Sequence, residues 1–394
     1  MVERCATLRI SIMSCQKVTA FGFSTSTFWQ SIQKRYFIAV VRRLHQLGFS
    51  RCQHLPIFRS IMTSGISNIS RSSPCILLTN DDGVNSPGIL LLAKRFVSWG
   101  CEVIVVAPDT NQSACSHRLT MSSDLRLKEL RSLGENIYSV SGSPADCVSV
   151  ALDPNGVFYH KNLVPTIAIS GINLGPNTSH DVLHSGTFAG ARHAAFYGVP
   201  SVATSLASND MREENILTAV EATFQLCSKL LTFLPRRPNN FQRPRATFVR
   251  RHVEESLTED RCFDILLQCF QAGDLLLNLN VPSRWNGKFL STSLGGVFYR
   301  DVLQRVSEKE ENSDMKEDEL FRLVVHGGIE FVQDERLTDI EALQRKFASI
   351  TCLSTWPETH PFEIPCCVLK YALHSAKSGF PTWVERGSEF QSQL

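Results

Sequence analysis

The sequence predicts an α/β fold whose core is a doubly wound, mostly parallel sheet with helices on both faces. Between residue 75 and about residue 206, short apolar runs with the length of buried strands alternate with segments of helical periodicity. The loops between these segments are short, which is typical of parallel strands joined by crossover helices. The weaker pattern after residue 206 predicts a smaller C-terminal appendage with a hairpin or helix.

The first 74 residues differ in composition from the rest of the 394-residue chain. They contain ten of the 40 Lys and Arg residues but one acidic residue, Glu3, and apolar residues recur at helical spacing from Phe28 to Leu47. A basic amphipathic helix in an acid-poor leader predicts a transit peptide, and hence a mitochondrial or plastid location. The alternative is a disordered or domain-packing extension of a cytoplasmic protein. Met62 could also start a shorter product.

The charge and cysteine content of the chain exclude several classes of protein. The residues after position 74 hold 30 basic and 37 acidic side chains, a net charge of −7. This acidic balance argues against a nucleic-acid duplex as partner. The thirteen cysteines contain no C-x-x-C pair, which predicts a reducing compartment and no disulfide framework. No stretch approaches the length of a transmembrane helix, so no membrane span is expected.

Five strands and three helices are expected in the first part of the core. The strands are Cys75–Leu78, Glu102–Ala107, Ile137–Val140, Thr166–Ile169 and Ser201–Thr204. The helices between them are Ile89–Trp99, Val148–Leu152 and Phe188–Tyr197. Pro144 shortly before the second helix and Asp146 in its first turn are ordinary helix-start signals.

The elements after residue 206 are less regular. A helix, a linker or surface insertion and a strand are expected at Ile216–Phe233, Pro235–Pro244 and Leu275–Val281. The acidic run Ser307–Glu319 predicts a solvated loop or helix face. Leu320–Val325 and Ile350–Leu353 are expected to pair as strands, with a helix at Thr338–Phe347 between them. Residues 357–394 have little periodicity and form an unassigned tail.

The first expected strand stops at two adjacent carboxylates, Asp81 and Asp82, within Asn80-Asp81-Asp82-Gly83. In an open α/β sheet, ligands bind outside the carboxyl ends of the strands. Two neighbouring carboxylates repel each other unless a cation holds them together, and a hard divalent metal bound through oxygen ligands would do so. The alternative is a polar turn with an Asp as helix N-cap.

Two other strand ends supply oxygen ligands to the same edge of the sheet. Ser113 follows the second expected strand, and Asn173 follows the strand Thr166–Ile169. Taken singly, Ser113 is more often a turn residue and Asn173 a strand-end cap. Together with Asp81 and Asp82 they predict an open site for one Mg²⁺ or Mn²⁺ ion.

A phosphate-binding segment is expected at the start of the third helix. Ser185-Gly186-Thr187 offers hydroxyls, backbone N–H groups and a positive helix terminus, although a plain Ser or Thr cap explains it as well. Ser143 and Asn177 could add donors to the same pocket. Four histidines are candidates for proton transfer, none of them assigned as a catalyst: His117, His180, His184 and His193.

Five sequence blocks, in this order, resemble the SurE family of metal-dependent phosphatases, the survival-protein nucleotidases. The blocks are Asn80-Asp81-Asp82-Gly83 with Pro87-Gly88, Ala107-Pro108-Asp109 with Asn111-Gln112-Ser113 and Ser116, Gly142-Ser143-Pro144-Ala145-Asp146-Cys147, Ser170-Gly171-Ile172-Asn173 with Gly175 and Asn177, and Ser185-Gly186-Thr187. The resemblance is strong over residues 75–206. It is weaker through Asn278–Pro282, Thr338–Leu343 and Ser349–Thr351.

The resemblance implies a Rossmann-like core in a phosphatase domain at residues 75–356, and a homodimer or tetramer that exchanges a C-terminal hairpin or helix. It implies hydrolysis of nucleoside monophosphates and other phosphate monoesters with one divalent metal ion per subunit. Residue by residue, the implied metal ligands are Asp81, Asp82, Ser113 and Asn173, the implied catalytic residues are Asn80, Asp81 and Asp82, and the implied phosphate-binding residues are Ser116, Ser143, Asn177, Ser185, Gly186 and Thr187.

The chain also departs from the family pattern. His184 stands where the family usually has Tyr, and Ala145 stands where Thr is common. Residues 235–262 look inserted, Cys352 replaces a usual Pro, and the tail from Pro357 has no match. The larger departures concern the oligomer contacts and not the metal site.

The resulting hypothesis is a divalent-metal-dependent phosphomonoesterase acting on nucleoside monophosphates, as a 5′- or 3′-nucleotidase. The alternative is a nucleotide-binding regulatory protein that has the same pocket and little turnover. An unrelated dinucleotide enzyme on a doubly wound sheet is disfavoured, because no G-x-G-x-x-G follows the first expected strand.

Overall fold

A computed structural model gives the fold of most of the chain after the leader. It describes residues 73–160, 164–208, 210–235, 257–300, 303–306, 322–325, 328–332, 336–360 and 362–392. The expected transit peptide, apart from its last two residues, and the acidic run at 307–319 lie outside these residues. So does most of the insertion expected at 235–262, whose last four residues begin a helix.

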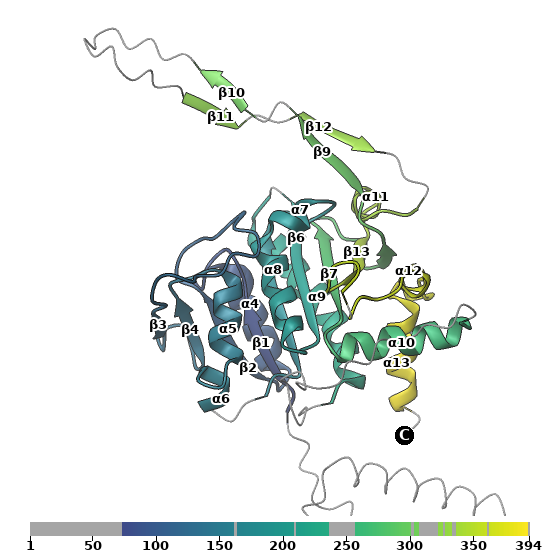
Figure 1. Cartoon of the computed structure of the whole chain (residues 1–394), viewed down its shortest axis with the longest axis horizontal. Coiled ribbons are helices and arrows are strands. Elements are labelled where there is room, and N and C mark those ends of the chain that lie inside the picture. The colour runs from purple at the N-terminus through teal and green to yellow at the C-terminus, as the bar shows by residue number, and fades with distance from the viewer. Residues whose placement is uncertain are drawn as a thin grey trace, which may run out of the picture. The chain divides into compact units, whose positions relative to one another are not determined.

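The centre of the fold is a nine-stranded sheet in the order β3-β4-β2-β1-β5-β6-β7-β13-β8 (Figure 1). Its six-stranded parallel core consists of β1 (Cys75–Thr79), β2 (Glu102–Pro108), β4 (Ile137–Val140), β5 (Ile167–Leu174), β6 (Ser201–Ala207) and β7 (Leu275–Pro282). Counted along the chain, these strands stand in the doubly wound order 3-2-1-4-5-6. The predicted Rossmann-like sheet is therefore confirmed. The order reverses between β1 and β5.

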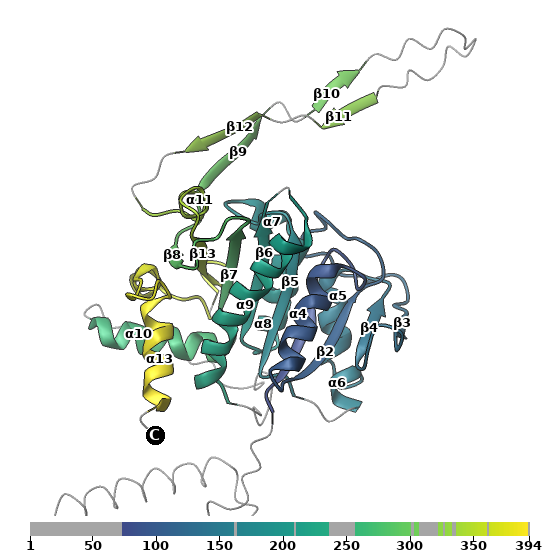
Figure 2. The same ribbon diagram turned by 180° about the vertical axis from the view of Figure 1, so that it is seen from behind.

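Helices cover both faces of this sheet because successive strand residues point to opposite sides. Ile76 and Leu78 pack in one core cluster with α4 (Pro87–Ser98) and α9 (Glu213–Phe233). Cys75 and Leu77 pack in the other cluster, with α5 (Pro144–Leu152) and the C-terminal part of α8 (Gly186–Phe196). Figure 1 shows α5 and α8 in front of the sheet, and Figure 2 shows α4 and α9 there.

Local signals explain where the two helices nearest the site begin. The apolar pattern predicts that the second helix begins at Val148. Ser143 and Asp146 form a reciprocal capping box, so α5 begins earlier, at Pro144. Pro87 stands at the start of α4, and a Cβ on Gly88 would lie 2.6 Å from the carbonyl oxygen of Ile172. The glycine therefore lets the start of α4 pack directly on the end of β5.

The expected pairing of Leu320–Val325 with Ile350–Leu353 is wrong. Strand β11 (Arg322–Val325) pairs with β10 (Leu303–Val306), whereas β13 (Ala348–Ser354) lies between β7 and β8 (Phe289–Thr292). Ala348 and Ile350 are buried in the core, so β13 extends the central sheet. At the other edge, the unpredicted strand β3 (Leu127–Glu129) runs antiparallel to β4.

The predicted C-terminal appendage consists of two antiparallel ribbons outside the central sheet (Figure 1). Strand β9 (Gly296–Arg300) pairs with β12 (Gly328–Val332), and β10 pairs with β11. The expected helix at 338–347 is α11 (Asp339–Gln344), which starts with a capping box between Thr338 and Glu341. Asp339 accepts hydrogen bonds from the backbone N–H groups of Ser179 and Gly295, which ties α11 to the base of the β9–β12 ribbon.

The weak periodicity of residues 357–394 indicates an irregular tail, but the structure has helices there. This segment forms α12 (Cys366–Leu369), a 3₁₀ turn η2 (Lys370–Leu373) and α13 (Thr382–Ser392). Trp383 is buried, 5.5 Å from the ring of Phe270 in α10 (Glu259–Gln271). These helices are short, so their apolar pattern is too brief to reveal a period.

One helix in the described part of the chain, α9, is long and apolar enough to cross a membrane. Its apolar stretch is 61% buried, and α9 packs on the central sheet in the main core cluster. Burial against the sheet accounts for its apolar composition without a membrane.

Candidate active site

The candidate site lies at the carboxyl ends of β1 and β5, where the strand order reverses. Thr79 and Ser170 are paired in register, so Asn80-Asp81-Asp82 leaves the sheet beside Gly171-Ile172-Asn173, which belongs to the last part of β5. The backbone N–H of Leu174 donates to Asp82 Oδ2 at 3.1 Å. Asn173 Nδ2 donates to the Gly175 carbonyl at 2.8 Å, so the amide oxygen of Asn173 is the end that can act as a ligand.

The loop after β2 brings Ser113 to the same place. The Val84 N–H donates to the Pro108 carbonyl at 2.8 Å, and the Gln112 N–H donates to the Asp81 carbonyl at 2.7 Å. Asn111 Oδ1 accepts from the backbone N–H of Ser113, which shapes the turn that presents this exposed serine. Ser113 is therefore one residue from a direct backbone contact with Asp81.

The N-terminus of α8 packs directly on Asp81. Ser185 caps the helix by accepting from the Phe188 N–H at 3.0 Å, and the Thr187 hydroxyl donates to Asp81 Oδ1. A Cβ on Gly186 would lie 2.9 Å from Asp81 Cβ and 2.8 Å from Cys115 Sγ. No side chain fits between these groups, so Gly186 lets the helix terminus approach the carboxylate.

The two carboxylates lie in a setting that opposes their ionisation. Burial raises the pKa of Asp81, against hydrogen bonds from Thr187 and Gly186 that lower it. Burial and the charge of Asp81 raise the pKa of Asp82 to about 6. Among the described residues, neither carboxylate has a Lys or Arg ion-pair partner. A cation bound between them would relieve this repulsion.

The donor set is the kind that a hard divalent cation takes. Within the described ranges, no three His, Cys, Asp or Glu side chains are grouped to hold a metal ion. The site instead has two carboxylates, the hydroxyl of Ser113 and the amide of Asn173, all oxygen donors. These residues fit Mg²⁺ or Mn²⁺ and do not fit a zinc site of Cys and His.

Asn80 and Ser116 also lie at this edge. Asn80 is fully buried, and its Nδ2 donates to the Gly83 carbonyl at 2.9 Å, which closes the turn after β1. Its Oδ1 is buried and has no hydrogen-bond partner among the described residues, as expected of a group that completes its bonding with a ligand. The Ser116 N–H donates to the carbonyl of His184, the last residue of α7 (Asp181–His184).

Ser143 and Asn177 are engaged in hydrogen bonds within the protein. Ser143 caps α5, and its hydroxyl donates to the Arg118 carbonyl at 2.5 Å. Asn177 Nδ2 donates to Ser205 Oγ at 2.9 Å, and its backbone is bonded to Asn278 and Asn280. These two side chains organise the loops around the site.

Arg118 is a candidate site residue that the sequence patterns do not reveal. Its Nη2 donates to Gln112 Oε1 at 2.5 Å, so the guanidinium lies over the loop that carries Ser113. Its charge also acts on the Cys115 thiol, whose pKa is raised by burial and by the charge of Asp81 and lowered by Arg118. An isolated arginine in a polar loop is usually a surface residue, and its bond to Gln112 in the loop that carries Ser113 suggests a role.

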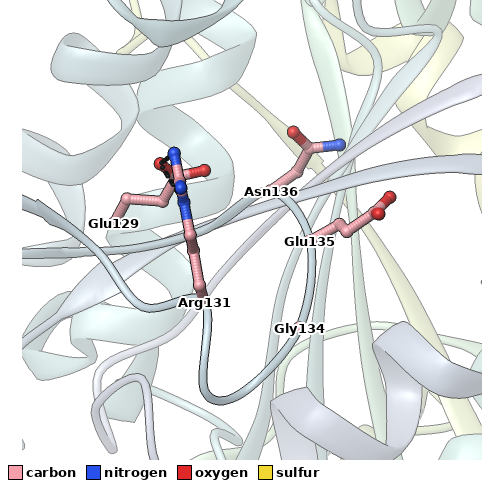
Figure 3. Close-up of a pocket in the computed structure, with 5 residues that line it drawn as sticks. All are labelled: Glu129, Arg131, Gly134, Glu135 and Asn136. Carbon is pink, nitrogen blue, oxygen red and sulfur yellow. Dashed lines mark hydrogen bonds and ion pairs between the residues drawn. The ribbon is translucent and has the colours of Figure 1, made fainter.

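A separate pocket lies in the turn between β3 and β4 and is lined by Glu129, Arg131, Gly134, Glu135 and Asn136 (Figure 3). Because β4 runs parallel to β2, the start of β4 at this turn lies at the amino ends of the parallel strands. Asp81 and Asp82 lie at the opposite, carboxyl ends. None of the expected site residues lines this pocket.

Residues 76–301 match the sequence model of the family described as Survival protein SurE. The chain belongs to the SurE family. The protein named 5′-nucleotidase SurE from Caldanaerobacter subterraneus subsp. tengcongensis is 33% identical over 280 residues, which is 70% of this chain and 89% of that protein. The 5′-nucleotidase SurE of Alkaliphilus metalliredigens is 45% identical over 142 residues, which is 36% of this chain and about half, 54%, of that protein.

A solved structure of the SurE protein from Aquifex aeolicus has the same fold. It aligns with a TM-score of 0.52 and 24% identity, over 73% of this chain and 95% of that one. At this identity the likeness concerns the fold alone.

Proposed function

We propose that this SurE-family chain is a divalent-metal-dependent phosphomonoesterase that hydrolyses nucleoside monophosphates and other phosphate monoesters. The observation that carries the proposal is the contact of Thr187 with Asp81, which sets a helix N-terminus against a pair of carboxylates. A helix N-terminus binds phosphate, and the carboxylates bind the cation that a phosphate dianion needs. The name 5′-nucleotidase given to the two relatives supports the same substrate class.

Each residue of the site has a distinct role in this proposal. Asp81, Asp82, Ser113 and Asn173 hold one Mg²⁺ or Mn²⁺ ion. That ion, when bound, neutralises phosphate charge and lowers the pKa of a water molecule. The positive N-terminus of α8 and the hydroxyl of Ser116 bind the non-bridging phosphate oxygens. Gly186 and Thr187 hold Asp81 in place, and Ser143, Asn177 and Ser185 hold the surrounding loops.

Asp82 is the group that we assign to accept the proton of the attacking water. Asp81 is almost fully buried and receives the Thr187 hydroxyl, whereas Asp82 is partly exposed. Phosphoryl transfer needs mainly positioning and charge neutralisation, so the buried amide of Asn80 and the Arg118 guanidinium complete the set by orienting and screening the phosphate.

Turnover with defined substrates tests the proposal. The purified full chain is assayed with 5′-AMP, 3′-AMP and p-nitrophenyl phosphate, with Mn²⁺ or Mg²⁺ and with EDTA. We expect metal-dependent phosphate release, and a loss of about 100-fold or more in Asp82→Asn because it removes a ligand and the proton acceptor. Glu135→Gln, in the turn at the opposite sheet edge, is the matched control and should keep full activity.

Two outcomes would contradict the proposal. Activity of Asp82→Asn within a few-fold of wild type would remove Asp82 from the metal site. Tight nucleotide binding without phosphate release, with every metal tried, would favour the nucleotide-binding regulatory protein instead.

We also propose that the chain forms a homodimer or tetramer through its C-terminal ribbons. Phe298 of β9 and Phe331 of β12 are 56% and 59% exposed. Phe298 pairs with Glu330 and Phe331 with Val297, so the two rings lie on opposite faces of the ribbon. Large apolar side chains exposed on a two-stranded ribbon are unusual on the surface of an isolated subunit. A second copy of the chain would cover them.

The leader at residues 1–74 remains a proposed transit peptide for mitochondria or plastids. Its acid-poor, basic and amphipathic composition supports this. Fusion of residues 1–74 to a fluorescent protein tests it: diffuse cytoplasmic fluorescence would contradict the proposal.

A further inference from the structure

Two histidines connect the loop after β2 to the helices behind it. His117 Nε2 and His193 Nδ1 are 2.9 Å apart, and His193 Nε2 lies 2.8 Å from Ser149 Oγ. His117 follows Ser116 in the loop that carries Ser113, whereas His193 belongs to α8 and Ser149 to α5. The three side chains therefore form a continuous hydrogen-bonded chain from the site loop into the interface of two packed helices.

The surroundings of both rings favour the neutral imidazole. Burial and the charge of Arg192 lower the pKa of His117. Burial and the neighbouring His117 lower the pKa of His193 to about 4, against Asp146, which raises it. Arg192, Asp146 and Tyr197 are the ionisable side chains that face the pair. A neutral imidazole has one donor and one acceptor nitrogen, so each junction can join a donor to an acceptor.

Further contacts hold the loop on both sides of His117. The His117 ring is stacked on Phe196 with centroids 5.4 Å apart and an angle of 13° between the planes. On the N-terminal side, the Ser116 N–H donates to the His184 carbonyl at 2.9 Å. On the C-terminal side, the Thr120 N–H and hydroxyl donate to Asp146 at 2.9 and 2.7 Å. Between these points, the His117–His193 hydrogen bond and the stacking of His117 on Phe196 join the loop to α8.

We propose that His193 and Ser149 are positioning residues, which hold the loop with Ser113 and Ser116 in place through His117. The inference rests on the proposed function, because it assigns that loop to the binding of metal and phosphate. Helix α8 then has two tasks. Its first turn contacts Asp81 and phosphate, and about two turns later His193 fixes the facing loop.

Two substitutions of His193 separate its two bonds. An Asn amide replaces the Nδ1 side of a histidine, so His193→Asn keeps the bond to His117 and loses Ser149. A Gln amide reaches the Nε2 position, so His193→Gln keeps Ser149 and loses His117. The pair changes the same residue to two neutral amides, which makes each variant the control for the other.

We expect His193→Gln to raise KM for 5′-AMP and the Kd for Mn²⁺ by about tenfold, the effect of one lost buried hydrogen bond, with kcat within about threefold. His193→Asn should stay within about threefold of wild type in all three constants, because it keeps the link to the loop. Ser149→Ala, which creates little cavity, should raise KM by about threefold by loosening His193. His374→Asn, in the exposed C-terminal segment beside Glu259, should change nothing.

Hydrogen exchange of residues 111–120 gives a readout that does not require turnover. In the metal-free protein, these amides should exchange faster in His193→Gln than in wild type, and at the wild-type rate in His193→Asn. Equal behaviour of the two variants, or unchanged exchange in both, would overturn the positioning role. If the wild-type protein shows no turnover, the proposed function fails, and the exchange comparison still decides whether His193 holds the loop.

Discussion

The hydroxyl of Thr187 donates to Asp81 Oδ1, which joins the first turn of α8 to the end of β1 across 106 residues of sequence. This bond opposes the effect of burial, since it lowers the pKa that burial raises. It therefore helps to keep Asp81 charged in a pocket that favours its protonated form.

Removal of that hydroxyl should weaken metal binding. Thr187→Val keeps the volume and the burial but not the donor, so the pKa of Asp81 should rise and more of the carboxyl should be protonated at pH 7. We expect a roughly tenfold higher Kd for Mn²⁺ by titration calorimetry, from the loss of one charge-assisted hydrogen bond. Thr187→Ser, which keeps the hydroxyl, should bind within a few-fold of wild type. Equal affinities of the Val and Ser variants would show that the bond is irrelevant to metal binding.

The metal-free protein should become more stable when Asp82 is neutralised. The folded pKa of about 6 lies above the ordinary value of 3.8. The unfolded chain therefore loses this proton first as pH rises, and the group destabilises the fold progressively between about pH 4 and pH 6. At pH 7.5 the cost is at most about 3 kcal/mol, and Asp82→Asn should recover part of it.

Urea denaturation of both proteins in EDTA, at pH 4.5 and pH 7.5, checks this prediction. The variant should be more stable than wild type at pH 7.5, and the difference should shrink at pH 4.5. With excess Mn²⁺ the order should reverse, because only the wild-type site gains stability from the bound ion. A variant that is less stable than wild type in EDTA at pH 7.5 would show that the charged Asp82 does not destabilise the metal-free fold.

Arg118 should contribute to substrate affinity. Arg118→Gln removes a positive charge beside the site without a buried cavity, so we expect KM for 5′-AMP to rise about tenfold and its dependence on salt to weaken. Arg131→Gln, an exposed arginine of the β3–β4 turn, is the matched control and should behave as wild type. An unchanged KM in Arg118→Gln would mean that the guanidinium only shapes the loop through Gln112.

The exposed aromatic residues of the ribbon should hold the oligomer together. The double variant Phe298→Ser and Phe331→Ser removes two large apolar side chains from the expected interface, so the assembly should dissociate at micromolar concentration. Light scattering coupled to gel filtration measures the mass of each protein. Met121→Ser removes another highly exposed apolar side chain, 86% accessible, from a different loop and should leave the mass unchanged. A wild-type monomer would refute the oligomer proposal directly.

The strands that bear the site could be predicted because their signals are local. Residues 75–78 and 167–169 are short apolar runs followed by polar residues, and parallel strands place such ends at one edge. For the same reason, Asp82 and Asn173 could be expected to meet before any contact was known. Leu174, the residue after Asn173, donates its backbone N–H to Asp82 Oδ2.

The observed pairing of the strand expected at Ile350–Leu353 and the helix near the C-terminus were not predicted, because both depend on contacts between distant segments. The composition of Ala348–Ser354 indicates a strand but not its partners. Its position between β7 and β8 depends on contacts with distant segments. Among the residues of the helix Thr382–Ser392 whose burial is described, Trp383 and Val384 have fully buried side chains, too few to show a period.

By itself, the sequence determined the alternation of strands and helices, the carboxylates at the end of the first strand and the residues that accompany them at neighbouring strand ends. Hydrophobic periodicity and strand-end chemistry are properties of short segments, so they can be read from one chain. Only the tertiary structure decided that Thr187 donates to Asp81, that Arg118 lies over the loop of Ser113 and that His117 meets His193. These pairs become neighbours when the whole sheet and both helix layers assemble, and no local pattern encodes distances across 76 or 106 residues of sequence.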